Sequence, residues 1–329
     1  MRYRIGAAAL ALGLASLGTT LGAAVNHATP HQRAFQFTYT AQITDLPAQA
    51  HLVRVWVPLA KTRANQQVLA RRITTAHPYE IHVEPTSGNE ILYVTLTAPV
   101  PQTFTVEIAY DALVREDRRA FQASLSGALQ RDLDPNALVI IDETVKHFSA
   151  EATTGRATDV ERARGIYDFV VGHMSYDKTT PGWGHGDTRR ACLIGKGNCT
   201  DFHSLFISMA RAAGLPARFV IGAPIPQTDE GPIAGYHCWA EVYTREQGWI
   251  PVDTSEAWKH PELKEYYFGT PDPNKLLISV GRDLELVPRQ QGEPLNFFLE
   301  PYVEVDGQPI RTVHTQFYFR SQPYKEGSG

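Results

Sequence analysis

The 329-residue sequence has only three cysteines, no strong excess of either charge and no long apolar run after its first 24 residues. A formal net charge of −4 without a Lys/Arg-rich tract excludes the basic face that general nucleic-acid binding requires. The lack of a later apolar run excludes a membrane span after the N-terminal segment, and we expect no membrane contact beyond that segment. Acidic loops with calcium-ligand spacing are also missing. The chain is long enough for one or two globular domains, and it carries no signal for an oligomeric state.

The N-terminal segment has the pattern of an export signal. Arg2 and Arg4 precede an apolar run from Ile5 to about Ala24, and small residues before position 28 offer a cleavage site. We therefore predict a signal peptide over 1–28 and an exported protein, periplasmic or extracellular. The alternative is an uncleaved membrane anchor, since the run is near the lower length limit for a span. The segment has no cysteine, which argues against the usual bacterial lipid attachment.

An odd number of cysteines leaves at least one thiol without a partner inside the chain. A disulfide between Cys192 and Cys238 would leave Cys199 free, and all three could equally be reduced. A bridge between Cys192 and Cys199 would instead remove the thiol that matters most below.

The pattern along the chain changes from strands to helices and back to strands. Short alternating runs between turn residues predict a small antiparallel β-sandwich domain over 30–115. Helical periodicity then begins a second domain over 116–320, with a helix expected after Asp134-Pro135 and another starting at Thr158 or Asp159. We expect 321–329 to be a disordered tail. The predicted fold class is therefore α+β.

Cys199 follows a glycine-rich turn and opens a helical pattern that ends at Gly214. The positive end of a helix dipole and the unpaired backbone amides there favour a thiolate over a thiol. Such a cysteine has the environment of a nucleophile. The alternative is a small apolar residue in a core, and the surrounding residues decide between the two.

His237 and Asp253 lie on two strand patterns joined by a short turn, so a hairpin is predicted. If the connecting loop has an odd number of residues, Asp253 faces His237 directly or diagonally on one side of the sheet. An imidazole can take the proton of a thiol, while a carboxylate fixes the ring's tautomer and stabilises the imidazolium. A histidine and an aspartate on a hairpin also occur often as an ordinary surface pair.

Three blocks together give this chain a resemblance to the transglutaminase-like superfamily of papain-like enzymes. They are G-N-C-T-D-F followed by a helix ending R-A-A-G-L-P-A-R-F-V-I-G, then Y-H-C-W-A-E-V-Y, then G-W-I-P-V-D-T. They occur in the family's order and cover about Tyr167 to Glu256. The resemblance implies a papain-like core, with helices packed on an antiparallel sheet, and places the family's nucleophile, base and third residue on Cys199, His237 and Asp253.

What the resemblance implies is a Cys-His-Asp enzyme that forms a thioester from amide bonds of a peptide or protein substrate. We expect hydrolysis, as by a cysteine protease, more than cross-linking, because water is the abundant acceptor in a dilute extracytoplasmic space. The alternative is a catalytically idle peptide-binding or scaffold protein with the same fold. Animal transglutaminases use a tryptophan upstream of the cysteine as an oxyanion donor, which points to Trp183, with Tyr176 as a second candidate.

Other polar residues near the motif have simpler explanations. Asp201 is expected to cap the helix rather than to contact the histidine. His203, one turn after Cys199, suggests a zinc site with Cys199 and His237, but ligand pairs with short spacing are missing. We therefore predict no metal and no cofactor.

Overall fold

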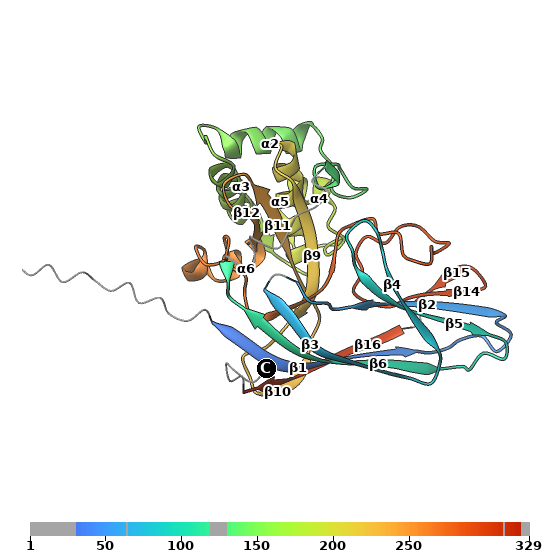
Figure 1. Cartoon of the computed structure of the whole chain (residues 1–329). Helices are drawn as coiled ribbons and strands as arrows, with labels where there is room; N and C mark the ends of the chain where they lie inside the picture. Colours follow the sequence, from blue (N-terminus) through green and yellow to red (C-terminus); the bar gives the residue numbers. More distant parts are fainter. Residues whose placement is uncertain (1–30, 64, 119–129, 312, 324–329) are drawn as a thin grey trace, which may run out of the picture.

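The computed structural model describes residues 31–63, 65–118, 130–311 and 313–323, and the predicted signal peptide lies outside these residues. Figure 1 shows two regions, a β-sandwich at the bottom and, above it, a region of helices packed on a smaller sheet. This mixed architecture agrees with the predicted α+β class. Within the described ranges, no helix has the length and apolar character needed to cross a membrane.

The β-sandwich is built from two five-stranded sheets, with strand orders β10-β16-β1-β6-β3 and β15-β14-β2-β5-β4. The strands of this region that precede the helices are β1 (Gln32–Ile43), β2 (Leu52–Leu59), β3 (Gln66–Thr75), β4 (Tyr79–Val83), β5 (Glu90–Thr97) and β6 (Phe104–Arg115). Strand β1 shows why they pack: alternate side chains, from Phe35 through Phe37 and Tyr39, are buried in the core. The predicted sandwich is confirmed.

The C-terminal strands return to the sandwich, which corrects the predicted domain division. The strands concerned are β14 (Tyr302–Val305), β15 (Gln308–Ile310) and β16 (Val313–Gln322). Strand β16 pairs with β1 along its length, and β14 pairs with β2. The predicted second domain over 116–320 is therefore wrong in its last part, because alternation identifies a strand but not the sheet edge that receives it. The expected tail over 321–329 begins too early, since Ser321 and Gln322 belong to β16.

The segment between β9 (Ala217–Pro224) and β11 (His237–Thr244) makes a second connection to the sandwich. Strand β9 leaves the helical region, and β10 (Glu230–Ile233) pairs with β16. In Figure 1, β9 runs down from the helices at the top, and β10 lies at the bottom beside the sandwich.

The second region packs helices on a four-stranded sheet with the order β12-β11-β9-β13. Its other strands are β11 (His237–Thr244), β12 (Gly248–Val252), β13 (Lys275–Val280) and the short parallel pair β7 (Ser175–Tyr176) and β8 (Lys196–Gly197). Its helices are α2 (Glu143–Thr153), α3 (Asp159–His173), α4 (Thr188–Ile194), α5 (Cys199–Ala212) and α6 (Thr254–Lys259), with single 3₁₀ turns η1 (Gln130–Asp132) and η2 (Pro261–Leu263).

The helix starts are partly as predicted. Helix α3 begins at Asp159 after a capping box made by Thr158, as expected. The helix expected directly after Asp134-Pro135 instead begins at Glu143, where Asp142 is the N-cap. The backbone between them bonds to other elements: the Leu138 carbonyl accepts from Thr188 N, and Ala137 N donates to Asp283. These tertiary partners replace the intrahelical bonds that the local pattern suggested.

Side chains of the sandwich fasten the edge of the second sheet. Strand β13 is an edge strand, and the Gln66 amide donates to the Leu277 carbonyl and accepts from its N–H. Asn89 makes the same two bonds to Val280. The two amides therefore satisfy backbone groups that an exposed edge would leave unpaired.

A buried charge cluster also joins the two regions. The carboxylate of Glu241 in β11 accepts from Arg218 of β9 at 2.7 Å and from Arg63 of the sandwich at 3.3 Å. The Arg218 guanidinium stacks over the Trp249 ring, 3.9 Å from its centroid. Glu241 is 1% exposed, so its charge depends on these two partners rather than on water.

Candidate active site

Helix α5 presents Cys199 at its first turn, and its start is held by a capping box. Asn198 is the N-cap and accepts from Thr200 N, while Asp201 accepts from the backbone N–H of Asn198. This confirms the capping role predicted for Asp201. A Cβ at Gly197 would lie 2.2 Å from an Asp201 carboxylate oxygen, so a glycine lets the chain enter the helix over that carboxylate. The predicted helix end at Gly214 is also confirmed.

Asp201 also anchors the glycine-rich loop that precedes the helix. Its two carboxylate oxygens accept from Gly184 N at 2.7 Å and Gly186 N at 3.1 Å. Gly186 has φ +67°, a conformation that an L side chain rarely adopts. Burial raises the pKa of Asp201, and the amide hydrogen bonds oppose that rise. The loop is thus tied to the helix that carries the thiol.

The predicted hairpin between β11 and β12 is confirmed. Thr244 pairs with Gly248, so the connecting loop has three residues, and Ala240 pairs with Val252. Continuing this register places Asp253 opposite Trp239 and diagonal to His237. The His237 Nε2 atom lies 2.6 Å from Asp253 Oδ2, and both side chains are buried. Orientation of the imidazole by the carboxylate follows from this contact.

The Cys199 side chain is buried and close to the same imidazole. Burial alone would raise the pKa of the Cys199 thiol, but hydrogen bonds with Cys238 and His237 outweigh it. The neighbouring imidazoles of His237 and His203 lower the pKa further, and the net direction is well below the usual value. The thiolate is therefore favoured at this position.

The pKa of the His237 imidazole shifts in the opposite direction. Burial alone would lower its pKa, but the charge of Asp253 and hydrogen bonds with Asp253 and Cys199 raise it to about 9. A thiol with a lowered pKa beside an imidazole with a raised pKa favours the thiolate–imidazolium ion pair near neutral pH. Because Nε2 is engaged by Asp253, Nδ1 is the nitrogen left for the thiol.

His203 is a buried, neutral histidine that ties the helix to the hairpin. Its Nδ1–H donates to the Cys199 carbonyl at 2.7 Å, and its Nε2 accepts from Thr254 N at 3.1 Å. Burial lowers the pKa of His203 to about 4, which agrees with Nε2 acting as an acceptor. Its 3.5 Å approach to Asp253 is therefore not an ion pair. Because both ring nitrogens have hydrogen-bond partners, the geometry also argues against the zinc alternative.

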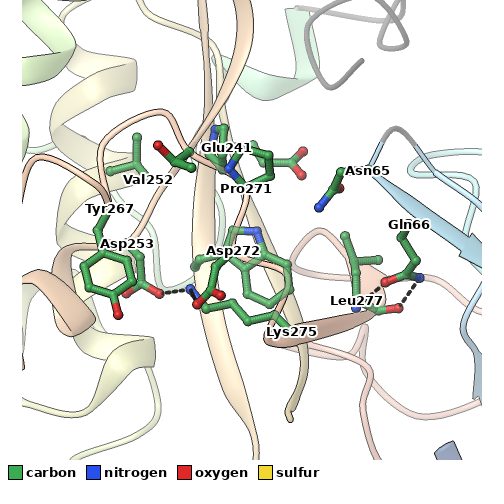
Figure 2. Close-up of a pocket in the computed structure, with 13 residues that line it drawn as sticks. Asn65, Gln66, Glu241, Val252, Asp253, Tyr267, Pro271, Asp272, Lys275 and Leu277 are labelled. Atoms are coloured by element: carbon green, nitrogen blue, oxygen red, sulfur yellow. Dashed lines mark hydrogen bonds and ion pairs between the residues drawn. The ribbon is translucent and has the colours of Figure 1, made fainter. Parts of the chain in front are cut away.

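Lys275 is a site residue that the sequence did not single out. Its ammonium group donates to Asp253 Oδ2 at 2.5 Å, the oxygen that His237 also contacts. This pair lies at a small cavity of about 30 Å³. Figure 2 shows Asn65 and Gln66 of the sandwich on the other side of it. A lysine outside the recognised motifs carries no local signal that it will meet a carboxylate 22 residues earlier.

All three cysteines are free thiols, one of the arrangements that the sequence left open. Cys238 is buried beside α5, where its Sγ lies 3.6 Å from Thr200 Oγ1. Burial and the adjacent Cys199 raise the pKa of Cys238 well above the usual value. Burial also raises the pKa of Cys192, to about 11. Only the Cys199 thiol is shifted toward the reactive form.

The two oxyanion candidates lie in different environments. Tyr176 in β7 pairs with Gly197, two residues before Cys199. Burial raises the pKa of the Tyr176 phenol, and the next largest cause is the charge of Cys199, which places the ring near the thiol. Trp183 lies farther out on the loop, 37% exposed, with its ring 5.9 Å from Lys178 Nζ. Tyr176 is therefore the better placed of the two.

The two tryptophans of the hairpin pack in different places. The Trp239 ring stacks on His237 with centroids 6.3 Å apart and an interplanar angle of 17°. Trp249 is buried and stacks on Arg218 instead. Trp239 therefore shields the imidazole, while Trp249 belongs to the charge cluster that joins the two regions.

Comparisons with known proteins agree with this architecture. The model of the transglutaminase-like superfamily matches residues 146–254. An uncharacterised protein of Haemophilus influenzae is 30% identical over 204 residues, which are 52% of this chain and 55% of that protein. The chain thus spans about half the length of this curated relative.

Among solved structures, a candidate cysteine protease from Cytophaga hutchinsonii superposes with a TM-score of 0.59 at 17% identity, over 90% of this chain and 94% of that one. The periplasmic domain of TgpA from Pseudomonas aeruginosa gives 0.37 at 17% identity, over 71% and 90%, which is too weak to bear on the fold. The first of these supports the fold over nearly the whole chain. Residues 146–254, which hold the site, thus match the model of the transglutaminase-like superfamily.

Proposed function

We propose that this chain is a cysteine enzyme that cleaves amide bonds of peptides or proteins through a thioester on Cys199. The observation that carries the proposal is the buried Cys199–His237–Asp253 arrangement, in which the pKa of the thiol is lowered and that of the imidazole is raised. Buried polar groups in this combination match the nucleophile, base and orienting residue of acyl transfer.

In the proposed reaction, His237 holds the thiol proton and the Cys199 sulfur attacks the carbonyl carbon. The carbon–nitrogen bond breaks as the imidazolium gives its proton to the leaving amine, which leaves a thioester. Water then attacks the thioester and passes a proton to the imidazole, the carbon–sulfur bond breaks, and the carboxylic acid leaves while the thiolate–imidazolium pair of Cys199 and His237 is restored. The backbone amide of Cys199, in the first turn of α5, and the phenol of Tyr176, whose strand pairs with Gly197 just before that helix, are the candidate donors to the oxyanion.

Thiol labelling tests the proposal directly. Iodoacetamide should modify Cys199 rapidly near neutral pH, and His237→Ala should slow this at least about a hundredfold, within the range of general-base contributions. His260→Ala, a change at a half-exposed histidine, is the matched control and should label like the wild type. Cys192, whose pKa is raised, serves as an internal slow-reacting thiol. Equal labelling of Cys199 in the wild type and in His237→Ala would instead favour an idle binding protein.

The reaction products distinguish hydrolysis from acyl transfer to an amine. Incubation with a peptide library and a primary amine, followed by mass spectrometry, should yield cleaved or deamidated peptides in excess over amine adducts. Cys199→Ser is the control for both products. Predominant amine adducts would contradict the hydrolytic preference and leave the thioester mechanism in place.

We further propose that the protein is exported and acts in the periplasm or outside the cell. The support is the N-terminal sequence, where two arginines precede an apolar run of about twenty residues. A mature N-terminus near residue 28 in protein recovered from the extracytoplasmic fraction is the expected result.

A further inference from the structure

We propose that Lys275 is a positioning residue of this site, whose ammonium group fixes the Asp253 carboxylate and limits how strongly it stabilises the His237 imidazolium. The inference rests on the proposed function, because it assigns Lys275 a role in tuning the base of that reaction. Its test uses a property of His237 that can be measured without substrate.

The carboxylate oxygen is shared. Asp253 Oδ2 contacts Lys275 Nζ at 2.5 Å and His237 Nε2 at 2.6 Å, so the two nitrogens are at most about 5 Å apart. The second oxygen, Oδ1, accepts from Ser255 Oγ and Glu256 N. With both oxygens held, the carboxylate has one orientation, and a cation shares the oxygen that orients the imidazole.

The ammonium group is enclosed rather than solvated. The Lys275 side chain is 10% exposed, and its Nζ lies 5.5 Å from the Trp239 ring centroid and 5.4 Å from that of Tyr267. Asp272 Oδ2 lies 3.6 Å away. Burial alone would lower the pKa of Lys275, but the charges of Asp253 and Asp272 raise it, so the lysine stays charged. A permanent positive charge therefore stands beside the site at working pH.

The sandwich helps to hold this lysine. Lys275 is the first residue of β13, and Gln66 bonds both backbone groups of Leu277 on the same strand. On its other edge β13 pairs with β9. A lysine whose strand is held from both sides is suited to positioning a partner, because little conformational freedom remains to be lost.

Several other charged or titratable groups act on the pair, and a test must allow for them. Glu256 Oε1 is 3.8 Å from His237 Nδ1, so it also favours the imidazolium. The groups that face His237 and Asp253 from the surrounding elements are Cys199 and His203 of α5, Cys238 of β11, Glu256 of α6, Tyr167 of α3, Tyr267, Asp272 and Lys275. Lys275 is the cation among them that touches the carboxylate.

The lysine opposes the rise in the pKa of His237 that Asp253 causes. Without this charge the imidazolium would hold its proton more tightly and would be a weaker proton donor to a leaving amine. With the charge of Lys275 in place, Asp253 remains ionised and oriented, and the His237 imidazolium can still give its proton to the leaving amine.

The test is an NMR titration of the His237 imidazole in the full mature chain. We expect Lys275→Met and Lys275→Gln to raise the pKa of His237 by about one to two units, the order expected for removing one charge at this separation. Lys275→Arg should keep it near the wild-type value. Lys264→Met, at a lysine whose ammonium group pairs with Asp168 rather than with Asp253, is the matched control and should cause no change.

In both neutral variants, the alkaline limb of the pH profile for Cys199 alkylation by iodoacetamide should also shift to higher pH. Two neutral substitutions guard against a single misfolded variant, and circular dichroism establishes that each is folded. An unchanged His237 titration in either folded neutral variant would overturn the role of Lys275. Slow labelling of Cys199 in the wild type itself would count against the proposed function and not against this inference.

Discussion

The sandwich and the helical region bury different kinds of side chain. In β1 the side chains alternate, and the buried ones are almost all apolar or aromatic. In α5 every residue from Cys199 to Arg211 is buried, including Asp201, His203 and Ser208. A polar group costs free energy to bury unless it is paired, and each of these three has a hydrogen-bond partner. Costly burial of polar groups is thus concentrated at the helix that carries the thiol.

This difference indicates which region can hold reactive side chains in a fixed arrangement. A helix buried on all sides gives up solvation of its polar side chains, and in return they are held by fixed partners and keep shifted pKa values. The sandwich contributes to the site through its junction, where Gln66, Asn89 and Arg63 reach across to the second sheet. Breaking the junction and breaking the helix should therefore have distinct consequences.

The largest effect on stability is expected at the buried charge cluster. Glu241→Ala would leave Arg63 and Arg218 as unpaired buried cations, at a cost of about 3 to 5 kcal/mol in the free energy of unfolding. Urea denaturation measures this. The matched control is Glu285→Ala, which breaks an exposed pair with Arg289 and should cost less than about 1 kcal/mol. Similar losses in both variants would remove the distinction between the buried junction and the surface.

A smaller effect, confined to acid pH, is expected from His203. Its pKa is about 4 in the folded chain and about 6.5 in the unfolded one, so the unfolded state binds the proton first as pH falls. The stabilisation is complete above pH 6.5 and declines by about 3 kcal/mol as pH falls toward 4. His237, whose folded pKa is raised, adds its full stabilisation below pH 6.5 and loses it toward pH 9.

Urea denaturation across pH 4 to 7 should therefore show a steeper loss for the wild type than for His203→Gln, although the variant is less stable at neutral pH. His260→Gln, at a half-exposed ring, should follow the wild type. Parallel curves for the wild type and His203→Gln would mean that His203 is not held neutral by the fold.

The smallest effect is expected at the amide that covers the sheet edge. Gln66→Ala removes both bonds to Leu277 and should cost about 1 to 2 kcal/mol, because buried backbone groups lose their partner. Hydrogen exchange of the Leu277 amide should become faster in this variant, while amides in β11 keep their protection. An unchanged exchange rate at Leu277 would show that water replaces the glutamine without cost.

Much of the candidate site could be predicted from local sequence. The helix start at Cys199, the cap at Asp201 and the three-residue hairpin loop that brings Asp253 diagonal to His237 all follow from neighbouring residues. These features depend on periodicity, capping and turn length, which act over a few residues. The helix expected after Asp134-Pro135 failed for the complementary reason, because distant partners took its backbone bonds.

By itself, the sequence determined the succession from a strand-rich part to helices and back to strands, the start of α5 and the residues that form the hairpin. Only the tertiary structure decided that β16 completes the sandwich beside β1, that His203 is neutral and that Lys275 meets Asp253. The two kinds of feature differ in how far apart the interacting residues lie along the sequence. Helix starts and hairpins are set by bonds between near neighbours, whereas the partner of an edge strand or of a buried charge is chosen among distant segments by the fold as a whole.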